Sequence, residues 1–370
     1  CDDFGHGTHT MGTIVGDDGA TNQIGVAPSA RWIGCRNMHR SVGTPQSYTE
    51  CFQWFVAPTD LDGDDPDPAL APDVINNSWS CPSSEGCSQS TLRTIVENTR
   101  AAGIVVVASA GNAGADCGSV ATAPAHYAAA LTVGATGTTD LIAPFSSRGP
   151  VLVDGSHRLK PDLVAPGVTV RSSVPGDDYD VNSGTSMAAP HVVGVTALLL
   201  SARPDLAGRV DEIEAILRAS TVPLTTTEGC GGDSGVDVPN NTYGAGRIDA
   251  VAAITGDADG DLVVNLDDCA PANGSWWSVP SPARNLTLEG GTLALISWQP
   301  PLEPGAATVQ YEVLRSERAD DFSNAVCVAG PQKTTAASDA AVPSTSFYYK
   351  VRVHNACGAA GPDAPSCAAQ

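Results

Sequence analysis

Two short motifs far apart in the chain contain a nucleophile and a base. His6 lies in HGTHTMG, and Ser186 lies in GTSMAAPH, directly before a long apolar stretch. A serine hydroxyl and a histidine that can take its proton are what acyl transfer to serine requires. Asn112, at the end of the apolar run VVVASAGN, adds a side-chain amide of the kind that can hold an oxyanion. These residue types therefore predict acyl transfer through Ser186.

Strands and helices are predicted to alternate along the part of the chain that contains these residues. Short β-branched and apolar runs predict strands over 31–38, 73–79, 104–110, 131–136 and 162–170. Helical patterns predict helices over 47–55, 90–103, 187–200 and 209–221. This alternation is typical of an α/β fold with a doubly wound, mostly parallel sheet, whose active site lies beyond the carboxyl ends of the strands. Asn112 follows the run 104–110 at such a position.

Five motifs, in the same order as in the family, make the chain resemble the subtilases, which are serine proteases. They are HGTHTMG, SAGN, FSSRGP (Phe145–Pro150), KPDLVAPG (Lys160–Gly167) and GTSMAAPH, and the resemblance extends over residues 1–255. HTMGTIVGDDGA, IGVAPSARWI and VINNSWSCP resemble the bacillopeptidase F-like branch. The resemblance implies a serine endopeptidase with an acyl-serine intermediate. His6 would be the base, Ser186 the nucleophile, and Asn112 with the Ser186 N–H the oxyanion donors.

The same resemblance implies two edges between which an extended peptide substrate inserts. One edge is Ser78, Trp79 and Ser80, and the other is Ser109, Ala110 and Gly111. Main-chain hydrogen bonds at such edges give affinity, and side-chain pockets give specificity. Many relatives have glycine in place of Ser80, so one wall of the first pocket would be narrower. Trp79 has the alternative role of a core side chain.

The aspartate of the family's triad has no counterpart here. It normally precedes the histidine by some tens of residues, whereas only five residues precede His6, and Asp2 and Asp3 are too close in sequence. We expect the aspartate strand to lie upstream of this stretch. Loss of that aspartate alone lowers kcat about 3 × 10⁴-fold in subtilisin, so the stretch by itself should be a feeble catalyst. The rival hypothesis is a catalytically inactive, subtilase-derived adhesion or scaffold protein, and a peptide ligase is a third.

His9 offers another use of the first motif. A zinc site of His6, His9 and Asp2 or Asp3 has suitable ligand types. It lacks the HExxH spacing, however, and it explains neither Asn112 nor Ser186. We therefore expect His9 to be a structural residue that packs within its own helix.

Composition indicates the cellular location of the protein and the classes of partner that it can bind. The net charge of −22 excludes binding to nucleic acid phosphates and disfavours anionic membranes. No apolar run approaches the roughly 20 residues of a membrane span. Eleven cysteines without a zinc-type spacing favour disulfides and an extracellular protein, although mostly free buried thiols are an alternative. We expect protein or peptide substrates, a monomer, and the pairs Cys35–Cys51, Cys81–Cys87, Cys117–Cys230 and Cys327–Cys357, while spacing alone leaves the connectivity open.

The C-terminal third of the chain differs in character from the rest. We expect a peptidase domain over 1–255, an acidic calcium-binding loop and linker over 256–282, and an all-β sandwich over 283–370. The loop resembles those of dockerins and thrombospondin type 3 repeats, and its oxygen donors would hold a structural calcium ion, although a solvated acidic linker is an alternative. The sandwich resembles a fibronectin type III module, with Trp298 in its second strand. The proposed metal ligands are Asp257, Asp259, Asp261, Asn265 and Asp268.

Overall fold

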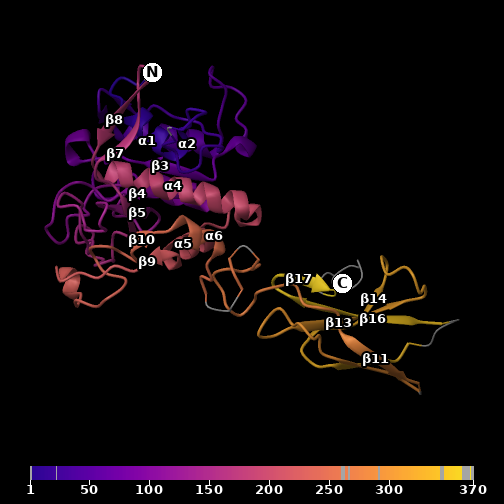
Figure 1. The fold of residues 1–370 in the computed structure, drawn as a ribbon. Helices are drawn as coiled ribbons and strands as arrows, with labels where there is room; N and C mark the ends of the chain where they lie inside the picture. Colours follow the sequence, from indigo (N-terminus) through magenta and orange to yellow (C-terminus); the bar gives the residue numbers. More distant parts are fainter. Residues whose placement is uncertain are drawn as a thin grey trace. The chain divides into compact units, whose positions relative to one another are not determined.

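A computed structural model describes residues 2–21, 23–259, 263–265, 267–290, 292–341, 346–360 and 367. The chain divides into two compact units, Cys1–Gly256 and Asp257–Gln370. Figure 1 shows the first unit as a mixture of helices and strands and the second as strands. Each unit is described by itself.

A six-stranded sheet forms the centre of the first unit, in the order β3-β4-β5-β6-β10-β9. Neighbouring strands run parallel, except for β9, which is antiparallel to β10. Every residue of β4 and β5 is buried, as expected for strands covered on both faces. The predicted doubly wound, mostly parallel fold is therefore confirmed. The strands are β3 (Val74–Asn77), β4 (Val105–Ser109), β5 (Leu131–Thr136), β6 (Leu163–Pro166), β9 (Thr221–Val222) and β10 (Arg247–Ile248).

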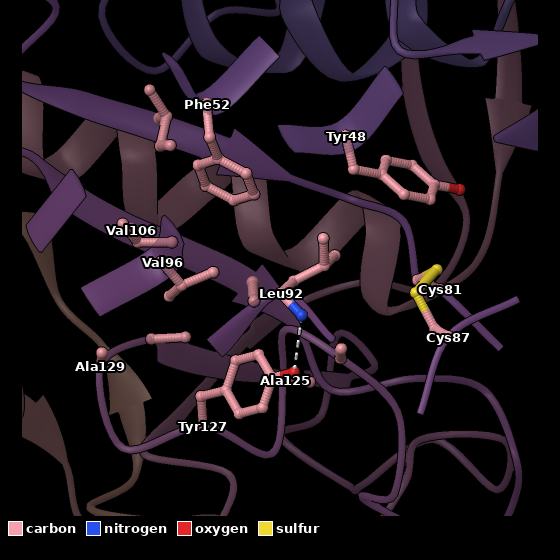
Figure 2. Packing of buried hydrophobic residues seen from close by; sticks show 14 of the residues in the cluster. Tyr48, Phe52, Cys81, Cys87, Leu92, Val96, Val106, Ala125, Tyr127 and Ala129 are labelled. Atoms are coloured by element: carbon pink, nitrogen blue, oxygen red, sulfur yellow. Dashed lines mark hydrogen bonds between the residues drawn. A yellow bond between two sulfur atoms is a disulfide. The ribbon is translucent and has the colours of Figure 1, made fainter. Parts of the chain in front are cut away.

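Helices cover both faces of this sheet. Helix α4 (Thr185–Ala202) packs along β3 to β6, and α1 (His6–Val15) and α6 (Ala250–Thr255) pack on α4. On the other face, side chains of α2 (Pro45–Val56) and α3 (Arg93–Ala101) form one cluster with alternate residues of β4 (Figure 2). The remaining helices are α5 (Val210–Ala219) and four short 3₁₀ turns, η1 (Pro68–Leu70), η2 (Ser83–Glu85), η3 (Pro204–Leu206) and η4 (Cys230–Gly232).

Helix α4 is apolar on nearly all sides because it is a core helix. By length and composition it is the one helix of the described residues that could cross a membrane, but 61% of its apolar window is buried. Pro190 lies inside this helix and cannot donate to the Ser186 carbonyl oxygen four residues earlier, which accepts from the Ser78 hydroxyl instead.

Two short antiparallel pairs stand apart from the central sheet. They are β1 (Met38–His39) with β2 (Val42–Gly43), and β7 (Val170–Val174) with β8 (Asp178–Asn182). The predicted strand over 162–170 is wrong in extent, because β6 ends at Pro166 and Val170 begins the hairpin. The predicted strand over 31–38 is wrong. Residues 31–37 have no hydrogen-bonded neighbouring strand, which a β-strand requires. The side chains of Trp32 and Ile33 are exposed.

The second unit contains two antiparallel sheets, β11-β12-β15 and β14-β13-β16-β17. Trp298 and Tyr311, one from each sheet, lie 5.5 Å apart between ring centroids and belong to one buried cluster. This arrangement agrees with the predicted all-β sandwich. The strands are β11 (Arg284–Glu289), β12 (Ala294–Gln299), β13 (Gln310–Ser316), β14 (Val326–Gln332), β15 (Ala336–Asp339), β16 (Tyr348–Asn355) and β17 (Gly358–Ala360).

Disulfides confirm three of the four predicted cysteine pairs, Cys35–Cys51, Cys81–Cys87 and Cys117–Cys230. The pair Cys327–Cys357 is wrong, because Cys327 bonds to Cys367 and Cys357 bonds to Cys269. Cys327 and Lys350 both lie opposite Leu314, on the two sides of β13, and Cys357 lies seven residues beyond Lys350. The two cysteines are thus two strands apart and displaced along the sheet, far outside disulfide reach.

Candidate active site

Three segments that are distant in sequence meet at one edge of the central sheet. Ser78 follows β3 directly, Asn112 follows β4, and Ser186 lies in the first turn of α4, which packs on both strands. Because β3 and β4 are parallel, their carboxyl ends lie at the same edge, where sites of doubly wound sheets form.

Ser186 and Ser78 are joined by two reciprocal hydrogen bonds. The Ser186 hydroxyl donates to the Ser78 carbonyl oxygen at 3.2 Å, and the Ser78 hydroxyl donates to the Ser186 carbonyl oxygen at 2.8 Å. These contacts hold the start of α4 against the end of β3. The Ser186 N–H belongs to the first helical turn, where no carbonyl lies four residues earlier within the helix. It is therefore available to an anion.

The Asn112 side chain is oriented by the residue that precedes Ser186. Its Oδ1 atom accepts hydrogen bonds from the Thr185 backbone N at 2.9 Å and from the Thr185 hydroxyl at 3.0 Å. Asn112 thus caps α4, because Gly184 at the N-cap has no side chain that could do so. The amide Nδ2 remains as the donating end, and a Cβ on Gly184 would lie only 3.4 Å from it. Sequence reasoning missed this role of Thr185, although the residue stands within GTSMAAPH.

His6 is the first residue of α1, the helix that packs on α4. No hydrogen bond joins its ring to Ser186 among the described residues. The imidazole is partly buried, and burial lowers its pKa below the ordinary value; nearby His9 lowers it further, while Asp2 opposes both. At neutral pH the ring is therefore largely uncharged, which is the state a general base requires.

The Asp2 carboxylate forms its hydrogen bonds at the start of α1 and not with the His6 ring. Its carboxylate accepts hydrogen bonds from the backbone N–H groups of Phe4, Gly5 and Thr8 and from the Thr8 hydroxyl, at 2.7 to 3.1 Å. Burial opposes ionisation, but these hydrogen bonds outweigh it and lower the pKa of Asp2 to about 2. The carboxylate thus takes the place of a cap at the start of α1.

His9 is fully buried, and its Nε2 atom lies 3.3 Å from the Asp180 carbonyl oxygen of β8. This contact fits the expected structural role, although the partner belongs to another element rather than to its own helix. No three His, Cys, Asp or Glu side chains gather as a metal site within the described residues.

The two predicted substrate edges differ in how much they are buried. The Trp79 ring stacks on Tyr48 at 4.0 Å between centroids, so its side chain packs in the core, while Ser80 is partly exposed. Ser109 and Ala110 are buried. Gly111 has a φ of +102°, which glycine adopts without strain, and its N–H donates to the Thr185 hydroxyl at 3.2 Å.

The predicted calcium ligands lie in the second unit. Asn265 and Asp268 are buried, and the Asn265 Oδ1 atom accepts a hydrogen bond from Ala258 N at 3.0 Å. The Oδ2 atoms of Asp259 and Asp268 are also inaccessible to solvent. Asp257 is exposed, and Asp261 lies outside the described residues.

A mostly parallel sheet with a serine at the N-terminus of its core helix, beside an asparagine amide, is typical of subtilisin-like proteins. The chain belongs to the subtilase family, whose model matches residues 2–246. It is 43% identical to bacillopeptidase F of Bacillus subtilis (strain 168) over 282 residues, which are 73% of this chain and 19% of that protein. It is 37% identical to subtilisin E of the same organism over 205 residues, 55% of this chain and 47% of that protein. The chain thus spans less than half of each relative.

One solved structure supports the fold alone. The prenylagaramide maturation protease PagA superposes with a TM-score of 0.52 and 22% sequence identity, over 68% of this chain and 82% of that protein.

Proposed function

We propose that the chain is the catalytic part of a secreted serine endopeptidase that hydrolyses peptide bonds. The observation that carries the proposal is the arrangement at the start of α4. There Thr185 orients the Asn112 amide toward the turn that contains Ser186. Two N–H donors and a hydroxyl nucleophile then face one reacting carbonyl. The five disulfides support an extracellular setting.

The reaction follows from these groups. The Ser186 oxygen attacks the peptide carbonyl carbon while His6 takes the hydroxyl proton. Asn112 Nδ2–H and the Ser186 N–H donate to the oxyanion of the tetrahedral intermediate. His6 then gives its proton to the leaving amine, the C–N bond breaks, and an acyl-serine remains. A water molecule, deprotonated by His6, releases the acid by the reverse sequence.

Substrate binding would use the two edges beside the nucleophile. Ser78, Trp79 and Ser80 would pair with one side of an extended peptide, and Ser109, Ala110 and Gly111 with the other. Since the Trp79 ring packs on Tyr48, this residue would act through its backbone. The partners are protein or peptide substrates, and we propose that the chain is a monomer.

The second unit would add a calcium ion and a spacer. The loop offers only carboxylate and amide oxygens, which suit a hard divalent cation, and two of these side chains are already buried. Asp257, Asp259, Asp261, Asn265 and Asp268 would hold the calcium ion. The three-plus-four strand arrangement supports a fibronectin type III-like module over 283–370.

Labelling with a fluorophosphonate, which phosphonylates an activated serine, tests the function. We expect slow labelling of the wild type and of Ser183→Ala, a control that removes an exposed serine three residues away, and none of Ser186→Ala. Folded wild-type protein without Ser186-dependent labelling would contradict the proposal and favour the inactive scaffold. Mass spectrometry of the labelled peptide identifies the serine, and circular dichroism checks folding.

A further inference from the structure

The segment FSSRGP (Phe145–Pro150), between β5 and β6, has no role in the chemistry described so far. Ser146 and Ser147 are fully buried, and Arg148 is 2% exposed. A buried arginine in a connecting segment is costly unless it is paired. The contacts of this segment lead directly to the loop that contains Asn112.

Ser147 contacts the residues on both sides of Asn112. Its backbone N donates to the Gly111 carbonyl oxygen at 2.9 Å, and its hydroxyl oxygen accepts from the Ala113 N at 3.2 Å. Gly114 N donates to the Phe145 carbonyl oxygen at 2.9 Å, which continues the same contact. The approach is close, since a Cβ on Gly111 would lie 3.0 Å from the Ser147 hydroxyl oxygen. The backbone of Asn112 is therefore held by Ser147 while its amide is held by Thr185.

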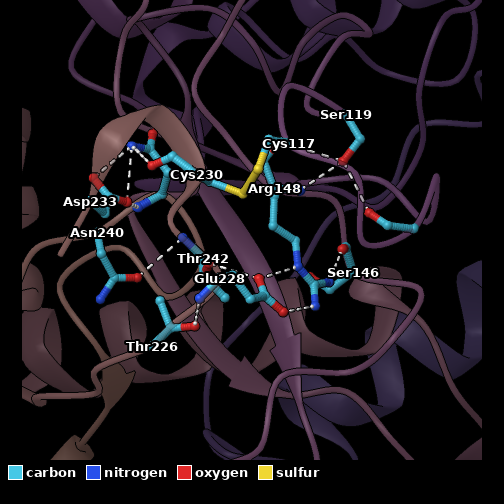
Figure 3. Close-up of a disulfide and its surroundings, with 12 residues drawn as sticks. Cys117, Ser119, Ser146, Arg148, Thr226, Glu228, Cys230, Asp233, Asn240 and Thr242 are labelled. Atoms are coloured by element: carbon cyan, nitrogen blue, oxygen red, sulfur yellow. Dashed lines mark hydrogen bonds and ion pairs between the residues drawn. A yellow bond between two sulfur atoms is a disulfide. The ribbon is translucent and has the colours of Figure 1, made fainter. Parts of the chain in front are cut away.

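Arg148, the residue after Ser147, anchors the segment through its side chain (Figure 3). Its guanidinium donates to the carbonyl oxygens of Ala143 and Ser146 and makes two hydrogen bonds to the Glu228 carboxylate, at 3.0 and 2.9 Å. This ion pair lowers the pKa of Glu228, so the carboxylate stays charged at neutral pH.

Glu228 is itself held in place. The Thr242 hydroxyl donates to it at 2.9 Å, and the Cys117–Cys230 disulfide joins its loop to the loop that follows Asn112. Within that second loop, Val120 N donates to the Arg148 carbonyl oxygen at 3.0 Å. The first half of the connection between β4 and β5, residues 111–120, is thus fastened to the FSSRGP segment.

We propose that Ser147 is a positioning residue for the oxyanion donor Asn112, and that the Arg148–Glu228 pair holds Ser147 in place. The proposal rests on the proposed function, because it gives the FSSRGP segment the task of aiming an amide at the oxyanion. Ser147 touches neither substrate nor nucleophile and acts only through the backbone of residues 111–113.

Ser147→Ala and Ser146→Ala form a matched pair of variants. Each removes a buried hydroxyl that accepts one backbone N–H, from Ala113 and from Ala135 respectively. Because each variant loses one such hydrogen bond, both should lower Tm similarly. Of the two serines, only Ser147 contacts the Asn112 loop. We expect Ser147→Ala alone to slow fluorophosphonate labelling, on the order of tenfold. That is part of the roughly 10²–10³ known for loss of the whole amide donor in subtilisin. Glu228→Gln should slow it less.

Asn112→Asp provides the background that identifies the mechanism. It keeps the Oδ1 acceptor for Thr185 but removes the donor, so Ser147→Ala should cause no further loss of labelling rate in it. An equal loss in that background, or equal labelling rates for the two serine variants, would overturn the proposal. Amide hydrogen exchange of residues 111–114 gives a readout independent of activity, and it should rise in Ser147→Ala but not in Ser146→Ala. Absence of Ser186 labelling in the wild type would instead refute the proposed function, while unchanged exchange would still refute the positioning role.

Discussion

In the proposed mechanism, Ser186 reacts only when His6 is uncharged. Burial and the neighbouring His9 lower the pKa of His6, and the negative charge of Asp2 only partly offsets them. Only the neutral imidazole can accept the serine proton. The acidic limb of the reaction should therefore report this lowered pKa.

We predict that the labelling rate rises with pH through a single pKa below the ordinary value of histidine and is constant from pH 7 to 8.5. Protonated His6 is inactive, so the rate falls about tenfold for each pH unit below that pKa. The measurement is the second-order labelling constant from pH 4.5 to 8.5 at constant ionic strength. An inflection above pH 7 would show that burial does not determine the pKa of His6.

At the scale of elements, the β7–β8 hairpin holds the helix that carries His6. Strand β7 packs on α1, and the Ser173 hydroxyl donates to the Thr8 carbonyl oxygen at 3.1 Å. Gly12 makes this approach possible, since a Cβ there would lie 2.1 Å from the Ser173 hydroxyl oxygen. The second glycine of HGTHTMG thus allows close packing between α1 and β7.

Gly12→Ala should destabilise the fold by about 1–3 kcal/mol, the usual cost of overpacking, and should also slow labelling because α1 moves. Gly7→Ala is the matched control on the same helix. Its added Cβ would lie 3.5 Å from Asp2, an ordinary contact, and alanine favours helix by about 1 kcal/mol over glycine. Urea unfolding measures both variants. A Gly12→Ala protein as stable as Gly7→Ala would refute the close packing.

At the scale of the whole molecule, the chain combines two compact units and a net charge of −22. Each unit has its own buried core, so each can unfold in a separate transition. The proposed calcium loop lies within the unit Asp257–Gln370. Calcium bound there should stabilise that unit selectively, whereas general screening of negative charge would affect both.

We predict that calcium at about 100 times its Kd stabilises the second unit by about 2.7 kcal/mol. The unfolding transition of the first unit should not change. Asp268→Ala should abolish the effect, and Asp267→Asn, which alters an exposed neighbour in the same loop, should retain it. Differential scanning calorimetry with calcium, magnesium or chelator measures both transitions. Equal stabilisation by magnesium, or in Asp268→Ala, would contradict a specific site.

Features that depend on local pattern can be predicted from the amino-acid order. The apolar run of β4, the apolar helix after Ser186 and the small disulfide loop Cys81–Cys87 were all predictable. Each of these is specified by neighbouring residues, through burial, helical periodicity or a short loop. His6, Asn112 and Ser186 could likewise be recognised as candidate site residues, because each lies in a short motif of neighbouring residues.

Features that need a distant partner follow from the folded chain and not from local pattern. Residues 31–37 read as a strand but lack a ladder, and Cys327 pairs with Cys367 because β13 separates it from Cys357. The orientation of Asn112 depends on Thr185 and Ser147, residues that approach it only after the sheet and α4 have packed. Hydrogen bonds between such segments depend on chain topology, which local periodicity does not contain.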